Sequence, residues 1–208
     1  MTDRRDDLFL IHVPKTGGTS VRTAMIKAGC RFGPCSAGHD WRPRHETVAE
    51  ARERIPQFGD LVTFSIVRNP YDRVVSWFHA YKVHTPEVSA QFFSGFSQAD
   101  RERSVRPFRR CLLSEDFPIY IGELLTQWEC VAYDGVVGVD HLLRHEHIEE
   151  DWLQLGGLVG MAAPLPTKRK GVHLAWRMYF TPRIADIVYD WAKEDFVRFG
   201  YDRESYRQ

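Results

Sequence analysis

The feature that most constrains the fold is the stretch LFLIHVPKTGGTS at residues 8–20. Residues 8–13 are mostly apolar and predict a buried strand, residues 14–18 break that strand, and a helix is expected from Thr19. Adjacent glycines let a backbone approach an anion closely, and a helix N-terminus presents unpaired N–H groups at the positive end of its dipole. Lys15 adds a point charge. The stretch therefore predicts a cradle for a phosphate group.

This cradle is P-loop-like but differs from a standard P-loop in the order of its residues. In the Walker pattern GxxxxGK[ST] the lysine follows the glycines, whereas Lys15 precedes them here. The structural alternative is a strand, a glycine turn and a capped helix with an incidental surface lysine. The residues expected to contact the anion are Lys15, Thr16, Gly17, Gly18, Thr19 and Ser20.

A second motif follows the next apolar stretch, residues 61–67, which predicts another strand. Arg68 comes directly after it, at the carboxyl end, where open α/β sheets place their ligand-binding groups. Pro70 suits the first turn of a helix, and Ser76 lies about two turns along that helix. Arg68 and Ser76 are therefore candidates for gripping one anionic group. A structural ion pair with Asp72 is the alternative role for Arg68.

Composition and length are those of one ordinary globular domain. The chain has 208 residues, 43% of them hydrophobic, and a formal net charge of zero, which argues against a broad nucleic-acid surface. Only about six apolar residues precede Pro14, too few for a signal-peptide core or a membrane span. The four cysteines are irregularly spaced and are expected to be reduced thiols. We therefore expect a cytoplasmic protein with no membrane span.

The order of the predicted elements is that of an α/β fold. We expect a single domain over residues 1–208, with a central, mainly parallel sheet flanked by helices. The pattern weakens after residue 84, and residues 84–130 are expected to form an irregular insertion or a lid on the acceptor side. Further predicted elements are helices at 19–28, 46–55, 117–128, 147–158 and 181–196, and a strand at 136–143.

Two strings resemble the nucleotide-binding motifs of sulfotransferases that use 3′-phosphoadenosine 5′-phosphosulfate (PAPS). They are HVPKTGGTS at residues 12–20 and FSIVRNPYDRVVS at residues 64–76. The likeness is greatest to the carbohydrate branch, which includes the heparan sulfate O-sulfotransferases, and it runs to about residue 202. Animal relatives usually carry a membrane anchor, so the chain resembles a soluble, bacterial-type member.

The resemblance implies an enzyme and its chemistry. A sulfuryl group would move from PAPS to a hydroxyl of a sugar or small molecule, and adenosine 3′,5′-bisphosphate would leave, with no metal required. Lys15 and the cradle would hold the 5′-phosphosulfate, and Arg68 with Ser76 would bind the 3′-phosphate. Lys168, Arg169 and Lys170 lie where relatives have a basic loop that closes over the nucleotide.

The same resemblance suggests candidates for the general base. His45 stands just before a short predicted helix and upstream of the VRNP motif, as does the base of related enzymes. His39, in the string GHDW, is the second candidate, because some glucosaminyl 6-O-sulfotransferases carry a similar cluster. A histidine suits the role because its ordinary pKa near 6.5 lets it accept a proton at neutral pH. His79 and His84 are the remaining alternatives.

Two other functions fit part of the sequence. An ATP-dependent, P-loop-like kinase would use the same cradle, but the position of Lys15 and the lack of an evident magnesium-binding aspartate after the second strand count against it. A nonenzymatic nucleotide-binding module would need no catalytic histidine. His141, His145 and His147 are interpreted as scaffold residues, so no metal site is expected. The acceptor and the oligomeric state stay open.

Overall fold

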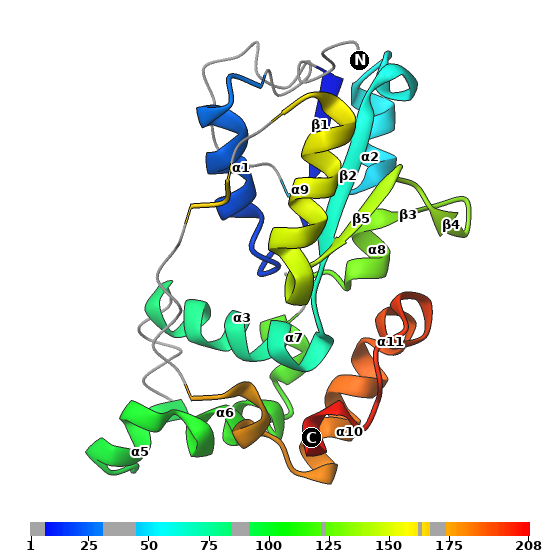
Figure 1. Cartoon of the computed structure of the whole chain (residues 1–208). Coiled ribbons are helices and arrows are strands. Elements are labelled where there is room, and N and C mark those ends of the chain that lie inside the picture. Colours follow the sequence, from blue (N-terminus) through cyan, green and yellow to red (C-terminus); the bar gives the residue numbers. More distant parts are fainter. Residues whose placement is uncertain (1–6, 31–44, 85–91, 122–123, 162–163, 167–173) are drawn as a thin grey trace. The chain divides into compact units, whose positions relative to one another are not determined.

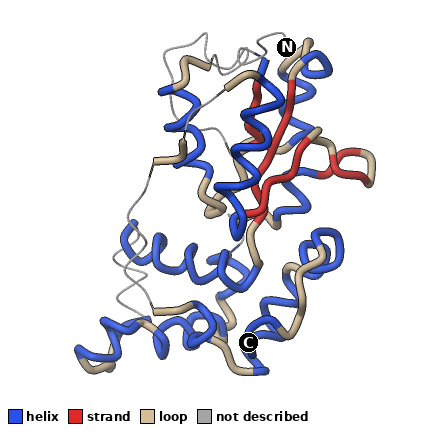
Figure 2. Tube along the Cα trace, in the orientation of Figure 1, coloured by secondary structure: helices blue, strands red, loops and turns tan. Residues whose placement is uncertain are grey.

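The computed structural model describes residues 7–30, 45–84, 92–121, 124–161, 164–166 and 174–208 (Figure 1). By their contacts the residues form two compact units. The first comprises Met1–Arg68 and Gln127–Lys168, and the second comprises Asn69–Thr126 and Arg169–Gln208. All the described strands belong to the first unit, and the second is helical (Figure 2).

A parallel sheet of three strands forms the centre of the first unit. Its strands are β1 (Leu8–Ile11), β2 (Val62–Val67) and β5 (His141–Arg144), in the order β1-β2-β5. Both pairings are parallel, with Leu10 beside Phe64 and Ile66 beside Leu143. The sequence-based prediction of an α/β fold with a mainly parallel sheet is thus confirmed. Because all three strands run the same way, their carboxyl ends meet at one edge.

Helices cover both faces of this sheet. On one face α1 (Gly18–Lys27) and α9 (Ile148–Val159) share a buried cluster with the sheet, in which the ring of Trp152 lies 6.3 Å from that of Phe64 (Figure 1). Phe9 points the other way, as alternation along a strand requires, and packs its ring 5.9 Å from Phe58. Phe58 belongs to a 3₁₀ turn that follows α2 (Val48–Arg54).

The end signals of α1 and α2 act as the sequence indicates, with small shifts of boundary. Gly29 has a φ of +73° after α1, where a left-handed residue closes the helix and favours glycine. The second helix was expected from residue 46 but begins at Val48, because Thr47 is its N-cap. The Thr47 side chain accepts from the Glu50 N–H, and the Glu50 carboxylate accepts from the Thr47 N–H at 2.7 Å, a reciprocal capping box.

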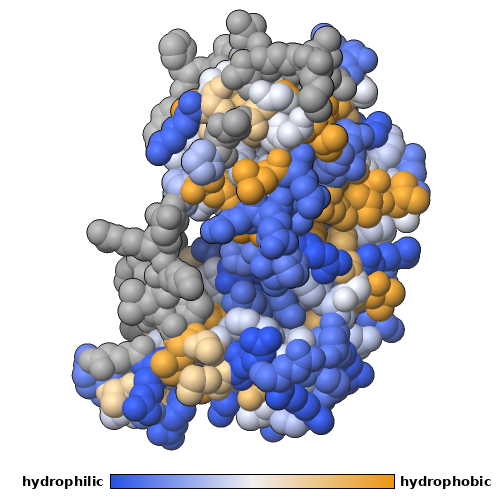
Figure 3. Space-filling view, viewed as in Figure 1, coloured by the Kyte–Doolittle hydropathy of each residue, from blue (hydrophilic) through white to orange (hydrophobic). Residues whose placement is uncertain are grey.

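The strand predicted at 136–143 is two strands instead. Its first part, β4 (Val136–Val137), pairs antiparallel with β3 (Ala132–Tyr133) in a hairpin after α8 (Gln127–Val131), and its second part is β5. The chain turns between them because the Gly138 N–H donates to the Val131 carbonyl at 2.8 Å. The hairpin presents apolar surface, with Val136 63% exposed (Figure 3).

The second unit packs its helices around an aromatic core. The ring of Phe108 lies 5.2 Å from that of Tyr179 and 5.4 Å from that of Phe78. Arg73 is fully buried and donates from Nη2 to the Leu125 carbonyl at 2.7 Å. The helices of this unit are α3 (Pro70–His84), α5 (Gln98–Arg103), α6 (Val105–Leu112), α7 (Phe117–Ile121), α10 (Pro182–Trp191) and α11 (Lys193–Phe199).

Three expectations for this part of the chain were wrong. The segment 84–130 was expected to form an irregular insertion or a lid, yet it contains α5 and α6, because α6 buries Phe108 and Leu112 and its half-buried Arg109 donates to the Tyr179 carbonyl at 2.9 Å. The helix expected at 117–128 is replaced by the separate helices α7 and α8. The last helix divides at Ala192 into α10 and α11.

The contact of α9 with the segment after it predicts opposite effects for neighbouring glycines. A Cβ on Gly156 would lie 2.5 Å from the Met161 carbonyl oxygen, whereas a Cβ on Gly157 would meet nothing within 4 Å among the described residues. Gly156→Ala should lower the free energy of unfolding by about 1–3 kcal/mol through overpacking. Gly157→Ala should raise it by about 0.5–1 kcal/mol through helix propensity.

Denaturant unfolding of the two variants beside the parent protein measures both effects. Equal effects of the same sign would contradict the packing described here.

Candidate active site

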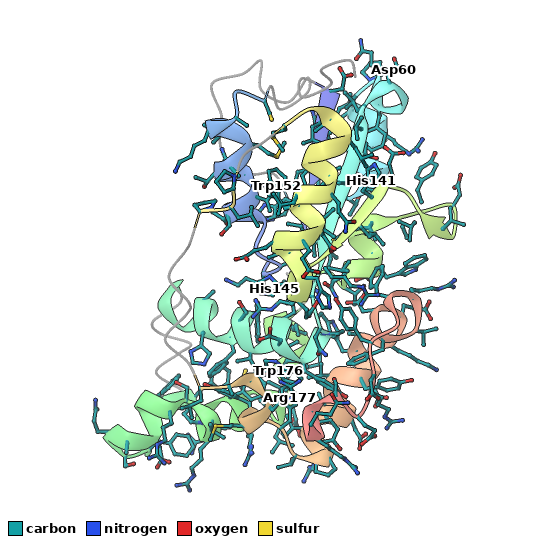
Figure 4. All side chains as sticks on the ribbon, in the orientation of Figure 1. Asp60, His141, His145, Trp152, Trp176 and Arg177 are labelled. Carbon is teal, nitrogen blue, oxygen red and sulfur yellow. The ribbon has the colours of Figure 1, made fainter. Side chains whose placement is uncertain are left out.

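Three side chains with nitrogen donors stand directly after the three strands of the sheet. His12 follows β1, Arg68 follows β2, and His145, which is labelled in Figure 4, follows β5. Since the strands are parallel and adjacent, these residues share the carboxyl edge, where α/β proteins bind their ligands. The loop from Pro14 to Gly18 leaves the same edge and leads into α1.

The loop adopts the conformation that an anion cradle needs. Lys15 and Gly17 have φ angles of +69° and +94°, so two positions of the loop are left-handed. Gly17 is the N-cap of α1, and no side chain among the described residues caps this helix end. Thr16 is buried and donates its hydroxyl back to the Val13 carbonyl at 2.9 Å. No described side chain therefore competes with a ligand for this helix end, where the Ser20 N–H donates to the Gly17 carbonyl at 2.9 Å.

Side chains from the neighbouring strands hold two consecutive carbonyl groups of this loop. Arg68 Nη1 donates to the Lys15 carbonyl at 3.0 Å, and His145 Nδ1 lies 2.9 Å from the Thr16 carbonyl oxygen. Arg68 is itself held by Gln127, a fully buried residue at the start of α8. The Gln127 amide accepts from the Arg68 N–H at 2.7 Å and donates to the Arg68 carbonyl at 2.9 Å.

Histidine rings leave no room for a side chain at either glycine of the cradle. A Cβ on Gly18 would lie 2.4 Å from Cδ2 of His12, and one on Gly17 would lie 2.9 Å from Nδ1 of His145. Gly17 is also fixed by its positive φ, whereas at Gly18 the three nearest described atoms to an added Cβ all belong to the His12 ring. The two adjacent glycines are thus required for different reasons.

His12 also brings His45 to the site. The two imidazole rings are 4.8 Å apart, and Nδ1 of His45 lies 3.3 Å from the His12 carbonyl oxygen. Burial lowers the pKa of His12 to about 4, helped by the positive charges of His45, Arg22 and Lys15. Nδ1 of His12 is buried and has no hydrogen-bond partner among the described residues. His12 is therefore neutral at physiological pH.

The surroundings of Lys15 also disfavour the protonated form of its side chain. Burial lowers the pKa of Lys15, and the neighbouring Arg68 guanidinium lowers it further. Both effects disfavour the charged ammonium group, and a bound anion would offset both. The cradle thus combines a helix N-terminus that no described side chain caps with a cation whose charge a bound anion would stabilise.

A sequence profile described as the sulfotransferase family matches residues 1–202, nearly the whole chain. The chain belongs to the sulfotransferase family. Searches of curated proteins and of solved structures gave no match. Membership confirms that this protein is a transferase of the sulfotransferase type, and the α/β architecture agrees with it.

Most of the cradle residues predicted for this sulfotransferase come together in the first unit. Lys15 to Ser20, Arg68 and His45 all belong to it. Ser76 is half-buried on α3, in the second unit. His39 and the three basic residues Lys168, Arg169 and Lys170 lie outside the described residues.

The two alternative candidates for the general base, His79 and His84, belong to the second unit. His79 places Nε2 2.9 Å from the Tyr179 hydroxyl, beside the aromatic core, which is a structural environment. His84 ends α3, and its side chain is outside the described part.

Sequence reasoning missed three residues of the site: His12, Gln127 and His145. Each acts through a contact with a distant part of the chain, which no local pattern reveals. The one available signal was position, since His12 and His145 directly follow strands that end at the ligand-binding edge.

Among the residues that the structure describes, no group of three or more His, Cys, Asp or Glu side chains is placed to hold a metal ion. No helix in the described ranges has the length and apolar character needed to cross a bilayer.

The buried state of His12 predicts a pH-dependent stability. The unfolded chain binds a proton at this residue below pH 6.5, whereas the folded chain binds it only below about pH 4. Stability should therefore fall as the pH drops through that window, by up to roughly 3 kcal/mol, and be unaffected by this residue above it. Denaturant unfolding at intervals between neutral pH and about pH 4 measures the slope.

Replacement His12→Asn should flatten this slope, whatever it does to stability at neutral pH. The control His147→Asn alters an exposed histidine and should leave the slope unchanged. A slope that persists in the His12 variant would show that another group causes it.

Proposed function

We propose that this sulfotransferase moves a sulfuryl group from PAPS to a hydroxyl of a sugar or small molecule and releases adenosine 3′,5′-bisphosphate. The motif resemblance favours the carbohydrate branch and hence a sugar hydroxyl. The observation that carries the proposal is the cradle: a left-handed loop after β1, a start of α1 that no described side chain caps, and Lys15 beside them. These features fit a doubly anionic phosphosulfate.

Lys15 and the N–H groups at the start of α1 would stabilise the leaving group. The donor supplies an activated sulfuryl group whose bond to the 5′-phosphate breaks during transfer. Negative charge then grows on that phosphate, and preorganised donors that face growing charge accelerate a reaction. Thr19 and Ser20 would add hydroxyl donors in the first turn of α1.

Arg68 and Ser76 are proposed to bind the 3′-phosphate. A guanidinium has five N–H donors in a fixed fork and can donate to more than one acceptor, and on Arg68 one donor binds the Lys15 carbonyl beside the proposed phosphate. Lys168, Arg169 and Lys170 are proposed to close over the nucleotide. Contacts of this kind would distinguish PAPS from nucleotides that lack a 3′-phosphate.

His45 is proposed as the general base. A carbonyl oxygen only accepts hydrogen bonds, so the contact with the His12 carbonyl favours a proton on Nδ1 of His45 and leaves Nε2 as the basic nitrogen. Nε2 would take the proton of the acceptor hydroxyl as its oxygen bonds to sulfur, and the 5′-phosphate would leave with the electron pair of the broken S–O bond. His39 remains the second candidate for this role.

Calorimetric titration with adenosine 3′,5′-bisphosphate tests the donor site. We expect micromolar binding that exceeds that of AMP, does not need magnesium, and weakens by about 10-fold or more in Arg68→Ala, since a charged hydrogen bond is worth roughly 1.5–3 kcal/mol. Arg198→Ala, which alters an exposed arginine of α11, is the matched control.

Three outcomes would separate the alternatives. A magnesium-dependent preference for ATP would favour a kinase. Binding of AMP as tight as that of the bisphosphate would remove the 3′-phosphate site. Tight binding by a protein that transfers no sulfuryl group to any acceptor of a broad hydroxyl panel would favour a nonenzymatic module.

The base is tested by transfer of labelled sulfuryl groups from PAPS to a panel of amino sugars, oligosaccharides and phenols. His45→Ala should lower turnover by about 100-fold or more, in line with the loss of a general base, while bisphosphate binding changes little. His147→Ala is the control. Near-complete activity in His45→Ala together with loss in His39→Ala would transfer the role to His39.

A further inference from the structure

The carbonyl groups of an amide-built anion site have to be turned away from the anion. Their oxygens carry partial negative charge, so a peptide that flips exchanges an attractive N–H for a repulsive oxygen. Glycine loops flip easily, because both signs of φ are open to glycine. The peptide between Thr16 and Gly17 is the one in this loop most prone to such a flip, because it directly precedes Gly17, whose φ is +94°.

We infer that His145 is a positioning residue of the cradle, which holds the Thr16 carbonyl and thereby directs the following N–H groups at the anion. The inference rests on the proposed function, in which that anion is the 5′-phosphosulfate of PAPS. The hydrogen bond carries it: Nδ1 of His145 lies 2.9 Å from the Thr16 oxygen. A carbonyl cannot donate, so Nδ1 carries the proton.

The ring of His145 also restrains the loop by its bulk. Its Nδ1 would lie 2.9 Å from a Cβ on Gly17, so the imidazole rests against the very residue whose rotation would turn the peptide. The His145 side chain thus supplies both a hydrogen bond to the loop and a steric restraint on Gly17. His145 reaches the loop from β5, through the 3₁₀ turn His145–His147, so the restraint comes from the sheet rather than from the loop itself.

Arg68 cannot take over this task. It holds the preceding carbonyl, that of Lys15, from the central strand β2. The two tethers therefore act on successive peptides and come from different strands. Losing the His145 tether leaves the Lys15 carbonyl fixed but frees the peptide that precedes Gly17.

The test compares two substitutions at this position with a control two residues away. His145→Asn keeps an N–H donor near the place of Nδ1, whereas His145→Leu keeps bulk but removes the donor. His147→Leu alters the exposed histidine of the same 3₁₀ turn. The probe is adenosine 3′,5′-bisphosphate, measured by calorimetry.

We expect His145→Leu to weaken bisphosphate binding by about 5- to 50-fold, the loss of one hydrogen bond worth roughly 1–2.3 kcal/mol. His145→Asn should restore binding to within about threefold of the parent, and His147→Leu should not change it. Parent-like binding by His145→Leu, or equal losses in the Leu and Asn variants, would overturn the inference. Absence of binding by the parent protein would instead overturn the proposed function.

A nitrogen NMR experiment tests the hydrogen bond without any ligand. Long-range ¹⁵N–¹H correlation spectra distinguish imidazoles protonated at Nδ1 from those protonated at Nε2. We expect an Nδ1-protonated histidine signal that disappears in His145→Asn, beside the one that the contact with the His12 carbonyl predicts for His45. Protonation of the His145 ring at Nε2 alone would rule out the tether to Thr16.

Discussion

Parallel pairing of three short strands is the constraint on which the candidate site depends. The register of β1, β2 and β5 brings His12, Arg68 and His145 to one edge, although they are far apart in the sequence. A slip of two residues along one strand would keep the buried face intact but move its last side chain by about 6.6 Å. The contacts with the Lys15 and Thr16 carbonyls would then be lost. The apolar core alone cannot choose between such registers, so the polar contacts at the edge contribute to the choice.

The cradle concentrates several unfavourable features in a few residues. Lys15 has a left-handed backbone, which costs a non-glycine residue of order 1 kcal/mol, and burial lowers the pKa of its ammonium group. His12 adds a buried nitrogen with no partner among the described residues. The surrounding sheet and the fully buried Gln127 hold these features in place. Strain that is gathered at one edge of an otherwise well-packed unit is typical of a binding site.

Local sequence signals predicted the parts of this site that a short stretch of chain determines. The strand, glycine loop and helix of residues 8–28 were found where expected, as was Arg68 at the end of β2. Residues whose role depends on distant partners were missed, because nothing near His145 in the sequence indicates a bond to Thr16. The division of 136–143 into two strands had the same cause, since it follows from the contact of Gly138 with Val131. In α6, numerous arginines concealed a buried face that includes Phe108.

The packing of Gly17 and Gly18 against imidazole rings means that the loop cannot be treated as a portable module. Each glycine is matched to a histidine that another strand or the end of β1 supplies, and the fit leaves less than 3 Å for a new carbon atom. Grafting the sequence PKTGG onto another sheet would transfer the loop residues without the two histidine rings that pack against its glycines. In related chains, a side chain at position 18 should be accompanied by a smaller residue at position 12. Positions 12 and 18 would then change as a pair, whereas Gly17 would stay glycine because its φ is positive.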